Sequence, residues 1–320
     1  MILRARDLRG AVVVLTGASS GLGRATAEAF AAHGSRLVLA ARTEEALAEV
    51  AAACREAGAE AVAVPTDVRD PEAVDRLRRR AVEEFGHVDV WVDAAGVLVA
   101  APFGEEEVDE LEALVATNVG GPLFGSRAAL ATFRQQGHGT LVNVSSLLGL
   151  VPNPVVPSYV MSKFAVRGLT LSLRQLVAGE RHIHVCDVMP GPIDTPLFAR
   201  AANRTGRQLR AIPPAYAPER VAAGIVACAR RPRREMTVGV ASHLILASHR
   251  LAPAATEWAV AQAAGRLILR PTPASPTSGA VVEPDRAGPV HGGWRRGGRL
   301  RRAAGERLGT LQGRRGADPA

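Results

Sequence analysis

The chain has 320 residues, of which 47% are hydrophobic and 22% charged, and this composition excludes a mainly disordered protein. The formal net charge is +8, but eight arginines against Glu306 and Asp318 place +6 of it in residues 291–320. The rest of the chain is nearly balanced, which argues against a nucleic-acid-binding core.

No apolar run reaches the roughly 18 residues that a membrane-spanning helix needs. The arginines and the short apolar stretch at the N-terminus lead directly into a glycine motif, which is not the pattern of a signal peptide. Cys54, Cys186 and Cys228 lie far apart and show no metal-ligand spacing, so we expect unpaired thiols in a reducing compartment. His182 and His184 share one strand face without a third ligand, so we expect structural histidines and no metal. These features predict a cytoplasmic protein.

Apolar, β-branched segments alternate along the chain with helical patterns. The predicted strands are Val12–Thr16, Arg36–Ala40, Ala61–Thr66, Val88–Val92, Thr140–Val144, His182–Val188 and a short one near Met236–Val240. Helical spacing lies between them, for example over Arg24–His33, Glu44–Ala57 and Pro71–Phe85. This order predicts an α/β fold over residues 1–250: a doubly wound, Rossmann-like parallel sheet of about seven strands with helices on both faces.

The composition changes after about residue 250. Leu251–Leu269 predicts one further helix, over residues 251–270, with Pro253 near its beginning. Residues 271–320 contain six prolines and ten glycines, so we expect a disordered tail there. We favour an inert extension over a tail whose arginines contact an anionic membrane or nucleic acid.

A glycine-rich turn follows the first predicted strand, with the sequence Thr16-Gly17-Ala18-Ser19-Ser20-Gly21-Leu22-Gly23. Gly17 permits the tight turn, Gly21 lets the backbone approach a pyrophosphate, and Gly23 lets helix and strand pack closely. The N-terminus of the following helix supplies amide donors for phosphates. The strand–turn–helix context therefore predicts a dinucleotide site.

The end of the second strand favours NADP(H) over NAD(H). An NAD site has an acidic residue there for the ribose 2′-hydroxyl, whereas this strand ends in Leu39-Ala40-Ala41-Arg42. A guanidinium at this place can pair with a 2′-phosphate through two hydrogen bonds. An ordinary surface arginine, and with it NAD(H), is the alternative.

Tyr159 and Lys163 are four residues apart and share one face of a helix. A phenol has a pKa near 10, and a neighbouring ammonium brings it toward the working range of an acid/base group. Lys163 is the only lysine among 39 basic residues, and Tyr159 is one of two tyrosines. Ser146 ends a predicted strand, where a hydroxyl can hold a carbonyl oxygen beside the phenol, and Ser145 is its competitor.

Taken together, these motifs resemble the short-chain dehydrogenase/reductase family, in its compact single-domain branch, over roughly residues 8–240. The resemblance rests on six motifs in order: the glycine turn at 16–23, Asp67-Val68, Asn118 with Val119-Gly120-Gly121, Ser146, Tyr159 with Lys163, and the stretch Pro190–Thr195.

The resemblance implies a role for each of these residues. Tyr159 is the acid/base, Lys163 lowers its pKa and holds the ribose, Ser146 orients the substrate carbonyl, and Asn118 positions a water in a proton relay. Asp67 and Val68 contact the adenine, and Ile193 and Thr195 contact the nicotinamide carboxamide. The full implied cofactor set is Gly17, Ser19, Ser20, Gly21, Leu22, Gly23, Arg42, Asp67, Val68, Ala94, Ala95, Gly96, Tyr159, Lys163, Pro190, Gly191, Ile193 and Thr195.

One motif departs from the family pattern, because Asp93-Ala94-Ala95-Gly96 stands where the family has Asn-Asn-Ala-Gly. Aspartate keeps the acceptor oxygens but loses the amide donor, and a buried carboxylate is costly without donors around it. We expect weakened cofactor affinity or stability with the chemistry intact.

The sequence thus predicts an NADP(H)-dependent oxidoreductase that interconverts an alcohol and a carbonyl, working as a homodimer or homotetramer. The alternatives are an NAD-dependent enzyme of the same type and a non-catalytic dinucleotide-binding regulator. Residues 196–218 occupy the place of a substrate lid and mix apolar residues with arginines, which favours an apolar substrate with an anionic group. A plain surface loop is the alternative. The sequence does not specify which substrate or which direction of reaction, because one fold serves many substrates.

Overall fold

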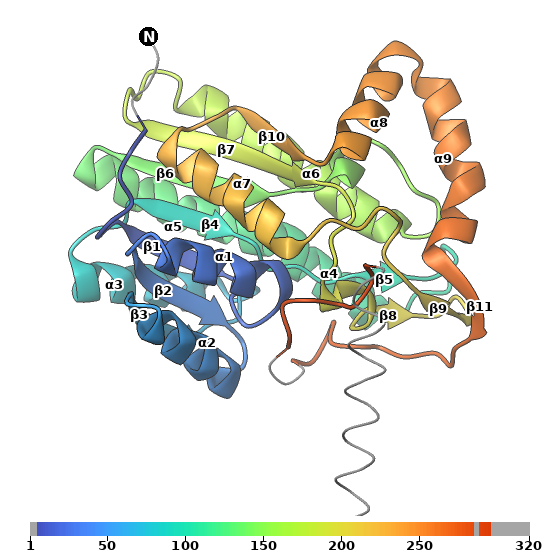
Figure 1. The fold of residues 1–320 in the computed structure, drawn as a ribbon, viewed down its shortest axis with the longest axis horizontal. Helices are drawn as coiled ribbons and strands as arrows, with labels where there is room; N and C mark the ends of the chain where they lie inside the picture. The colour runs from blue at the N-terminus through green and yellow to red at the C-terminus, as the bar shows by residue number, and fades with distance from the viewer. Residues whose placement is uncertain (1–4, 285–287, 296–320) are drawn as a thin grey trace, which may run out of the picture.

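The computed structural model describes residues 5–284 and 288–295 (Figure 1). The strands are β1 Val12–Thr16, β2 Arg36–Ala41, β3 Glu60–Pro65, β4 Val90–Asp93, β5 Val99–Ala100, β6 Gly139–Val144, β7 Ile183–Pro190, β8 Ala202–Asn203, β9 Arg207–Leu209, β10 Glu235–Val238 and β11 Leu269–Pro273. The α-helices are α1 Gly21–Ala31, α2 Glu44–Glu56, α3 Pro71–Phe85, α4 Val108–Val115, α5 Gly121–Gln136, α6 Pro157–Leu176, α7 Pro218–Arg230, α8 Val240–Leu251 and α9 Pro253–Ile268. A π-helical turn, Ala116–Gly120, joins α4 to α5.

Seven strands form one parallel sheet in the order β10-β7-β6-β4-β1-β2-β3. The predicted doubly wound fold is confirmed. The strand order reverses between β1 and β4, and ligands of such sheets bind outside the carboxyl ends of the strands at that place.

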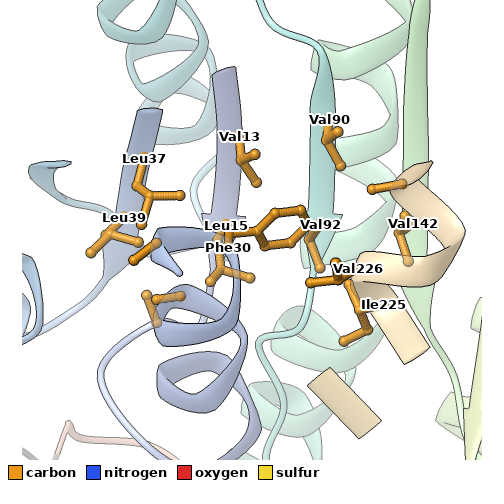
Figure 2. Close-up of a cluster of buried hydrophobic side chains, with 14 of the residues drawn as sticks. Val13, Leu15, Phe30, Leu37, Leu39, Val90, Val92, Val142, Ile225 and Val226 are labelled. Atoms are coloured by element: carbon orange, nitrogen blue, oxygen red, sulfur yellow. The ribbon is translucent and has the colours of Figure 1, made fainter. Parts of the chain in front are cut away.

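The central strands are buried on both faces, which explains their continuous runs of Val and Leu. Val13 and Leu15 of β1 point to one face, where they pack with Phe30 of α1 and Ile225 of α7 (Figure 2). Val14 points to the opposite face, which α3 and α5 cover. Side chains alternate in this way along every strand, so the core is two apolar layers with the sheet between them.

The C-terminal part differs from the sequence expectation in two ways. The helical pattern over Leu251–Leu269 corresponds to α9, and Pro253 lies in its first turn, where proline is tolerated. The first difference is that another helix, α8, precedes α9. Residues 271–284 and 288–295, expected to be disordered, instead pack on the protein, while residues 296–320 lie outside the described part. Backbone hydrogen bonds and the fully buried side chain of Val281 hold the described part of this segment in place. A count of its glycines and prolines does not reveal these contacts.

Cys54, Cys186 and Cys228 are buried free thiols, as predicted. Within residues 5–284 and 288–295, no cluster of three or more His, Cys, Asp or Glu side chains is arranged to hold a metal ion. Over the same residues, no helix combines the length and apolar character needed to cross a bilayer.

Candidate active site

A cavity of about 960 Å³ lies at the carboxyl ends of the strands. All residues of the predicted cofactor set line it: Gly17, Ser19, Ser20, Gly21, Leu22, Gly23, Arg42, Asp67, Val68, Ala94, Ala95, Gly96, Tyr159, Lys163, Pro190, Gly191, Ile193 and Thr195. Ser146 also lines it, and Asn118 lies behind the wall that Gly96 and Thr117 form. The fold therefore gathers at one edge of the sheet residues that are up to 178 positions apart (17 to 195) in the sequence.

The glycine turn adopts the close-packed form that its sequence predicts. Gly17 has a φ of +71°, and a Cβ there would lie 2.7 Å from the Cα atom of Ala95. A Cβ at Gly23 would lie 2.0 Å from the carbonyl oxygen of Gly17, so only glycine allows α1 to begin this close to β1. The N-terminus of α1 consequently faces the cavity.

Arg42 lies at the end of β2, beside the Asp67–Arg69 ion pair. Its pKa is lowered, first by burial and then by the charge of Arg69. Burial works to raise the pKa of Asp67, but hydrogen bonds from Arg69 and the charge of Arg42 bring it below its ordinary value. The Nη2 atom of Arg69 lies 2.6 Å from the Oδ2 atom of Asp67. Positive charge therefore exceeds negative charge at this end of the cavity.

Tyr159 and Lys163 lie one turn apart on α6. The ammonium of Lys163 is 5.6 Å from the centre of the Tyr159 ring and donates to the carbonyl of Val144 at 3.0 Å. Burial lowers the pKa of Lys163 to about 8, against the charge of Asp187. Burial also raises the pKa of Tyr159, and a hydrogen bond with Ser146 opposes this shift. The phenol thus lies between a cation and a hydroxyl.

Ser145 and Ser146 have different partners. The Ser145 hydroxyl donates to Asp187 and is buried, whereas Ser146 is the one that bonds with the Tyr159 phenol. The Ser146 oxygen also accepts from the amide of Leu148 at 3.1 Å and caps a short 3₁₀ turn. Of the two competing hydroxyls, Ser146 is the one placed beside the phenol.

Asn118 is fully buried in the π-helical turn between α4 and α5. Its amide oxygen accepts from Val97 at 2.8 Å, and its nitrogen donates to Val97 at 2.9 Å and to the Ser162 hydroxyl at 3.1 Å. The Ser162 hydroxyl donates to the Tyr159 carbonyl at 2.7 Å. A chain of hydrogen bonds therefore runs from Asn118 to the helix that carries Tyr159. Such π-turns are frequent at functional sites.

Asp93 is buried at the end of β4, and burial raises its pKa to about 8. Its Oδ1 atom accepts from Trp91 at 3.0 Å and from Thr16 at 3.5 Å. Its Oδ2 atom has no hydrogen-bond partner among the described residues, and neither has Oδ1 of Asn143, which the strand register places beside Asp93. Two buried acceptors without donors favour the protonated acid, whose hydrogen can satisfy one of them.

Sequence reasoning missed several residues that line the cavity. Arg200 lies within the predicted lid, residues 196–218, and donates to the Ser20 hydroxyl at 3.3 Å. Another group of missed residues lies on α8, on α9 and in the segment after β11. They are mostly Ala and Leu, types that carry no chemical signature, so only their place in the fold identifies them.

Comparison with known proteins places this geometry in a family. The model of the short chain dehydrogenases matches residues 11–205. The uncharacterized oxidoreductase YxnA of Bacillus subtilis is 35% identical over 263 residues, which are 80% of this chain and 72% of YxnA. The 3beta-hydroxysteroid dehydrogenase 1 of Eggerthella lenta is 39% identical over 225 residues, which are 68% of this chain and 85% of that enzyme.

Solved structures agree with the sequence comparison. A short-chain dehydrogenase/reductase from Burkholderia phymatum, in complex with NAD, superposes with a TM-score of 0.70 at 29% identity, over 85% of this chain and 99% of that one. An alcohol dehydrogenase from Thermococcus sibiricus, complexed with 5-hydroxy-NADP, gives a TM-score of 0.62 at 26% identity, over 71% and 95% of the chains. The chain belongs to the short-chain dehydrogenase/reductase family, whose members are oxidoreductases that bind a nicotinamide dinucleotide.

Proposed function

We propose that this protein transfers a hydride between NADP(H) and the CH–OH or C=O group of a small molecule, with Tyr159 as the acid/base group. The observation that carries the proposal is the convergence of Ser146, Tyr159 and Lys163 on the same cavity as the glycine turn and Arg42. A homodimer or homotetramer in the cytoplasm belongs to the same proposal.

The residues present fit a dinucleotide. Side chains at Gly17 and Gly23 would close the turn, and their absence opens the N-terminus of α1 to phosphates. Arg42 lies where the ribose 2′ position is expected, and the nearest carboxylate, Asp67, is already paired with Arg69. This balance of charge supports NADP(H). When bound, the nicotinamide donates or accepts the hydride.

The side chains divide the remaining chemistry among themselves. In carbonyl reduction, the Tyr159 hydroxyl gives its proton to the substrate oxygen as the C–H bond forms, and in alcohol oxidation it takes that proton back. Ser146 holds the same substrate oxygen through its hydroxyl. The Lys163 ammonium favours the phenolate that remains, because a cation close by stabilises an anion. Asn118 holds the start of α6 through Ser162 and so keeps the phenol in place.

An NAD-dependent enzyme of the same type is the second candidate. The observation in its favour is that the Arg42 guanidinium already donates to the carbonyls of Ala280 at 2.9 Å and Val282 at 3.2 Å. A guanidinium engaged by backbone carbonyls has fewer donors to offer to a phosphate.

Titration of the purified protein with NADPH and with NADH, followed by nucleotide fluorescence, tests the cofactor. We expect tighter binding of NADPH, and a loss of about tenfold or more in NADPH affinity for Arg42→Ala with little effect on NADH. Arg36→Ala, an exposed arginine on the same strand, is the matched control. Equal affinities that do not respond to Arg42→Ala would support the NAD-dependent candidate. Binding of neither nucleotide by the folded protein would contradict the proposed function, and binding without turnover would favour the non-catalytic regulator.

A further inference from the structure

The cavity extends beyond the catalytic groups into a second compartment, which carries an inference about the substrate. This compartment lies between the lid residues Leu197, Phe198 and Ile212 and the helices α8 and α9. Its lining contains no charged side chain: of the described residues that line the whole cavity, the charged ones are Arg42, Asp67, Lys163 and Arg200. Each of these belongs to the cofactor end or to the catalytic group.

The wall that α9 contributes consists mainly of small side chains. Ala255, Ala259 and Ala263 recur at helical spacing and line the cavity from one face of the helix. Ala252, just before the helix, also lines it, and Ala264 and Ile268 are its buried members. Methyl groups leave this face of the cavity apolar. Leu244 and Leu251 of α8 are exposed and also line the cavity, so this compartment opens to solvent along an apolar edge.

From this lining we infer that the substrate is a neutral alcohol or carbonyl compound with a large apolar skeleton, an inference that rests on the proposed function. An anionic group carried into this compartment would lose its hydration without finding a cation. Each buried methylene would instead gain free energy by leaving water.

A matched set of ketones tests the inference. With NADPH, we expect kcat/KM to rise by about 100-fold or more from butanone to 2-decanone, and to fall by a similar factor from 2-decanone to 9-oxodecanoate, which carries a carboxylate at its far end. Ala263→Phe should remove most of the advantage in kcat/KM that 2-decanone has over butanone. Ala261→Phe, exposed on the same helix and absent from the lining, is the control.

The outcomes separate the two proposals. If butanone and 9-oxodecanoate are reduced as well as 2-decanone, the substrate class is wrong and the proposed function stands. If NADPH binds but no carbonyl compound is reduced and no alcohol oxidised, the proposed function fails and takes the substrate class with it.

A second, independent observation concerns the segment after β11, which crosses the cofactor site. We call residues 277–284 and 288–294 the C-terminal strap. It is joined to the lid by backbone bonds between Thr277 and Asn203 at 2.8 and 3.1 Å and from Ala280 to Arg200 at 2.9 Å. Val281 is fully buried in a cluster that includes Leu114 and Tyr159. Figure 1 shows the chain returning from β11 toward α1.

The strap bonds to three residues of the predicted cofactor set. The amide of Gly21, at the beginning of α1, donates to Pro289 at 3.1 Å. Arg42 donates to Ala280 and Val282, at the opposite end of the site. The indole of Trp294 donates to the carbonyl of Thr195 at 2.8 Å.

The strap covers the cavity without filling it. Ala280 and Pro284 line the cavity together with the glycine turn and Arg42, so space remains beneath the strap. A dinucleotide that reaches from Arg42 to Thr195 must pass the strap to enter or leave. We propose that the C-terminal strap is a gate that opens for cofactor exchange, with Trp294 as its anchor on the lid.

Stopped-flow fluorescence with NADPH on the full-length protein tests the gate. Trp294→Ala removes the indole hydrogen bond and the edge-to-face contact with Phe198, whose ring centre is 6.3 Å away. We expect both the association and the dissociation rate constants to rise by about fivefold or more, with the dissociation constant changed by less than about threefold. Trp294→Phe, which keeps the ring, should give an intermediate effect, and Trp258→Ala on α9 is the control.

Rate constants equal to those of the unmodified protein would contradict the gate. An increase in dissociation alone would make the strap part of the binding surface, and an increase in association alone would make it a competitor of the cofactor. Either result also overturns the gate.

Discussion

The two ends of the cavity are built in different ways. At the cofactor end, the glycine turn and Arg42 directly follow parallel strands, Asp67 lies two residues after the end of another, and backbone geometry dictates several of the residue types. At the substrate end, α8 and α9 contribute mostly alanine and leucine. Local backbone geometry specifies the residue types at the cofactor end, whereas packing between distant segments forms the substrate end. The cofactor end therefore indicates the class of chemistry, and the substrate end indicates the choice of substrate.

The largest expected loss of activity is for a substitution at Tyr159, where the two ends of the cavity meet. We expect Tyr159→Phe to lower kcat/KM for carbonyl reduction by about a thousandfold, because it removes the proton donor, while the affinity for NADPH changes by less than about threefold. Steady-state rates and a nucleotide titration measure the two quantities. Tyr216→Phe, at the only other tyrosine, should cost little activity; an equal loss in both variants would contradict the role of Tyr159.

The charge of Lys163 should make kcat/KM for carbonyl reduction depend on pH. Since burial lowers its pKa to about 8, the ammonium is charged below that pH and loses its proton above it. We expect kcat/KM for carbonyl reduction to fall about tenfold for each unit of pH above 8, because the neutral amine no longer favours the phenolate. A pH–rate profile measures this dependence. Lys163→Arg should be much less active and show no such decline; a decline at the same pH would assign it to another group.

A smaller effect, on thermal stability, is expected for a substitution of Asp93 at the cofactor end. Its pKa of about 8 in the folded protein lies well above the ordinary value of an unfolded aspartate, so folding takes up a proton at neutral pH. Stability is therefore fully present at low pH and is lost as the pH rises from about 4 to about 8. Asp93→Asn, whose amide can donate to Asn143, should raise the Tm by a few degrees at pH 8 and by less at pH 5. Thermal unfolding at both pH values measures this difference. A lower Tm at pH 8 would contradict the account.

The cofactor end could be predicted from the sequence because its residues answer to backbone constraints. A Cβ at position 17 or 23 would have no room, so both positions require glycine. Tyr159 and Lys163 are four residues apart and therefore share one face of an α-helix. The sheet and its helices followed from the alternation of buried strands with amphipathic helices.

The substrate end and the C-terminal strap could not be predicted in the same way. The alanines of α9 are good helix formers at any surface, so their sequence does not show that they face a cavity. The strap has a composition typical of disorder, yet backbone bonds to Asn203 and Arg200 and the burial of Val281 hold it in place. Hydrogen bonds between distant backbone groups leave no trace in residue type. The expectation that residues 271–320 are an inert extension therefore needs revision for the residues of the strap.

The most direct test of the central claim is to follow the hydride itself. NADPH carrying deuterium at both positions of its nicotinamide C4 would be incubated with the protein and 2-decanone, and the product analysed by mass spectrometry. The account predicts 2-decanol with one deuterium on the carbinol carbon, and no product with Tyr159→Phe on the same time scale. Product without deuterium, or equal product from the Tyr159 variant, would contradict the account.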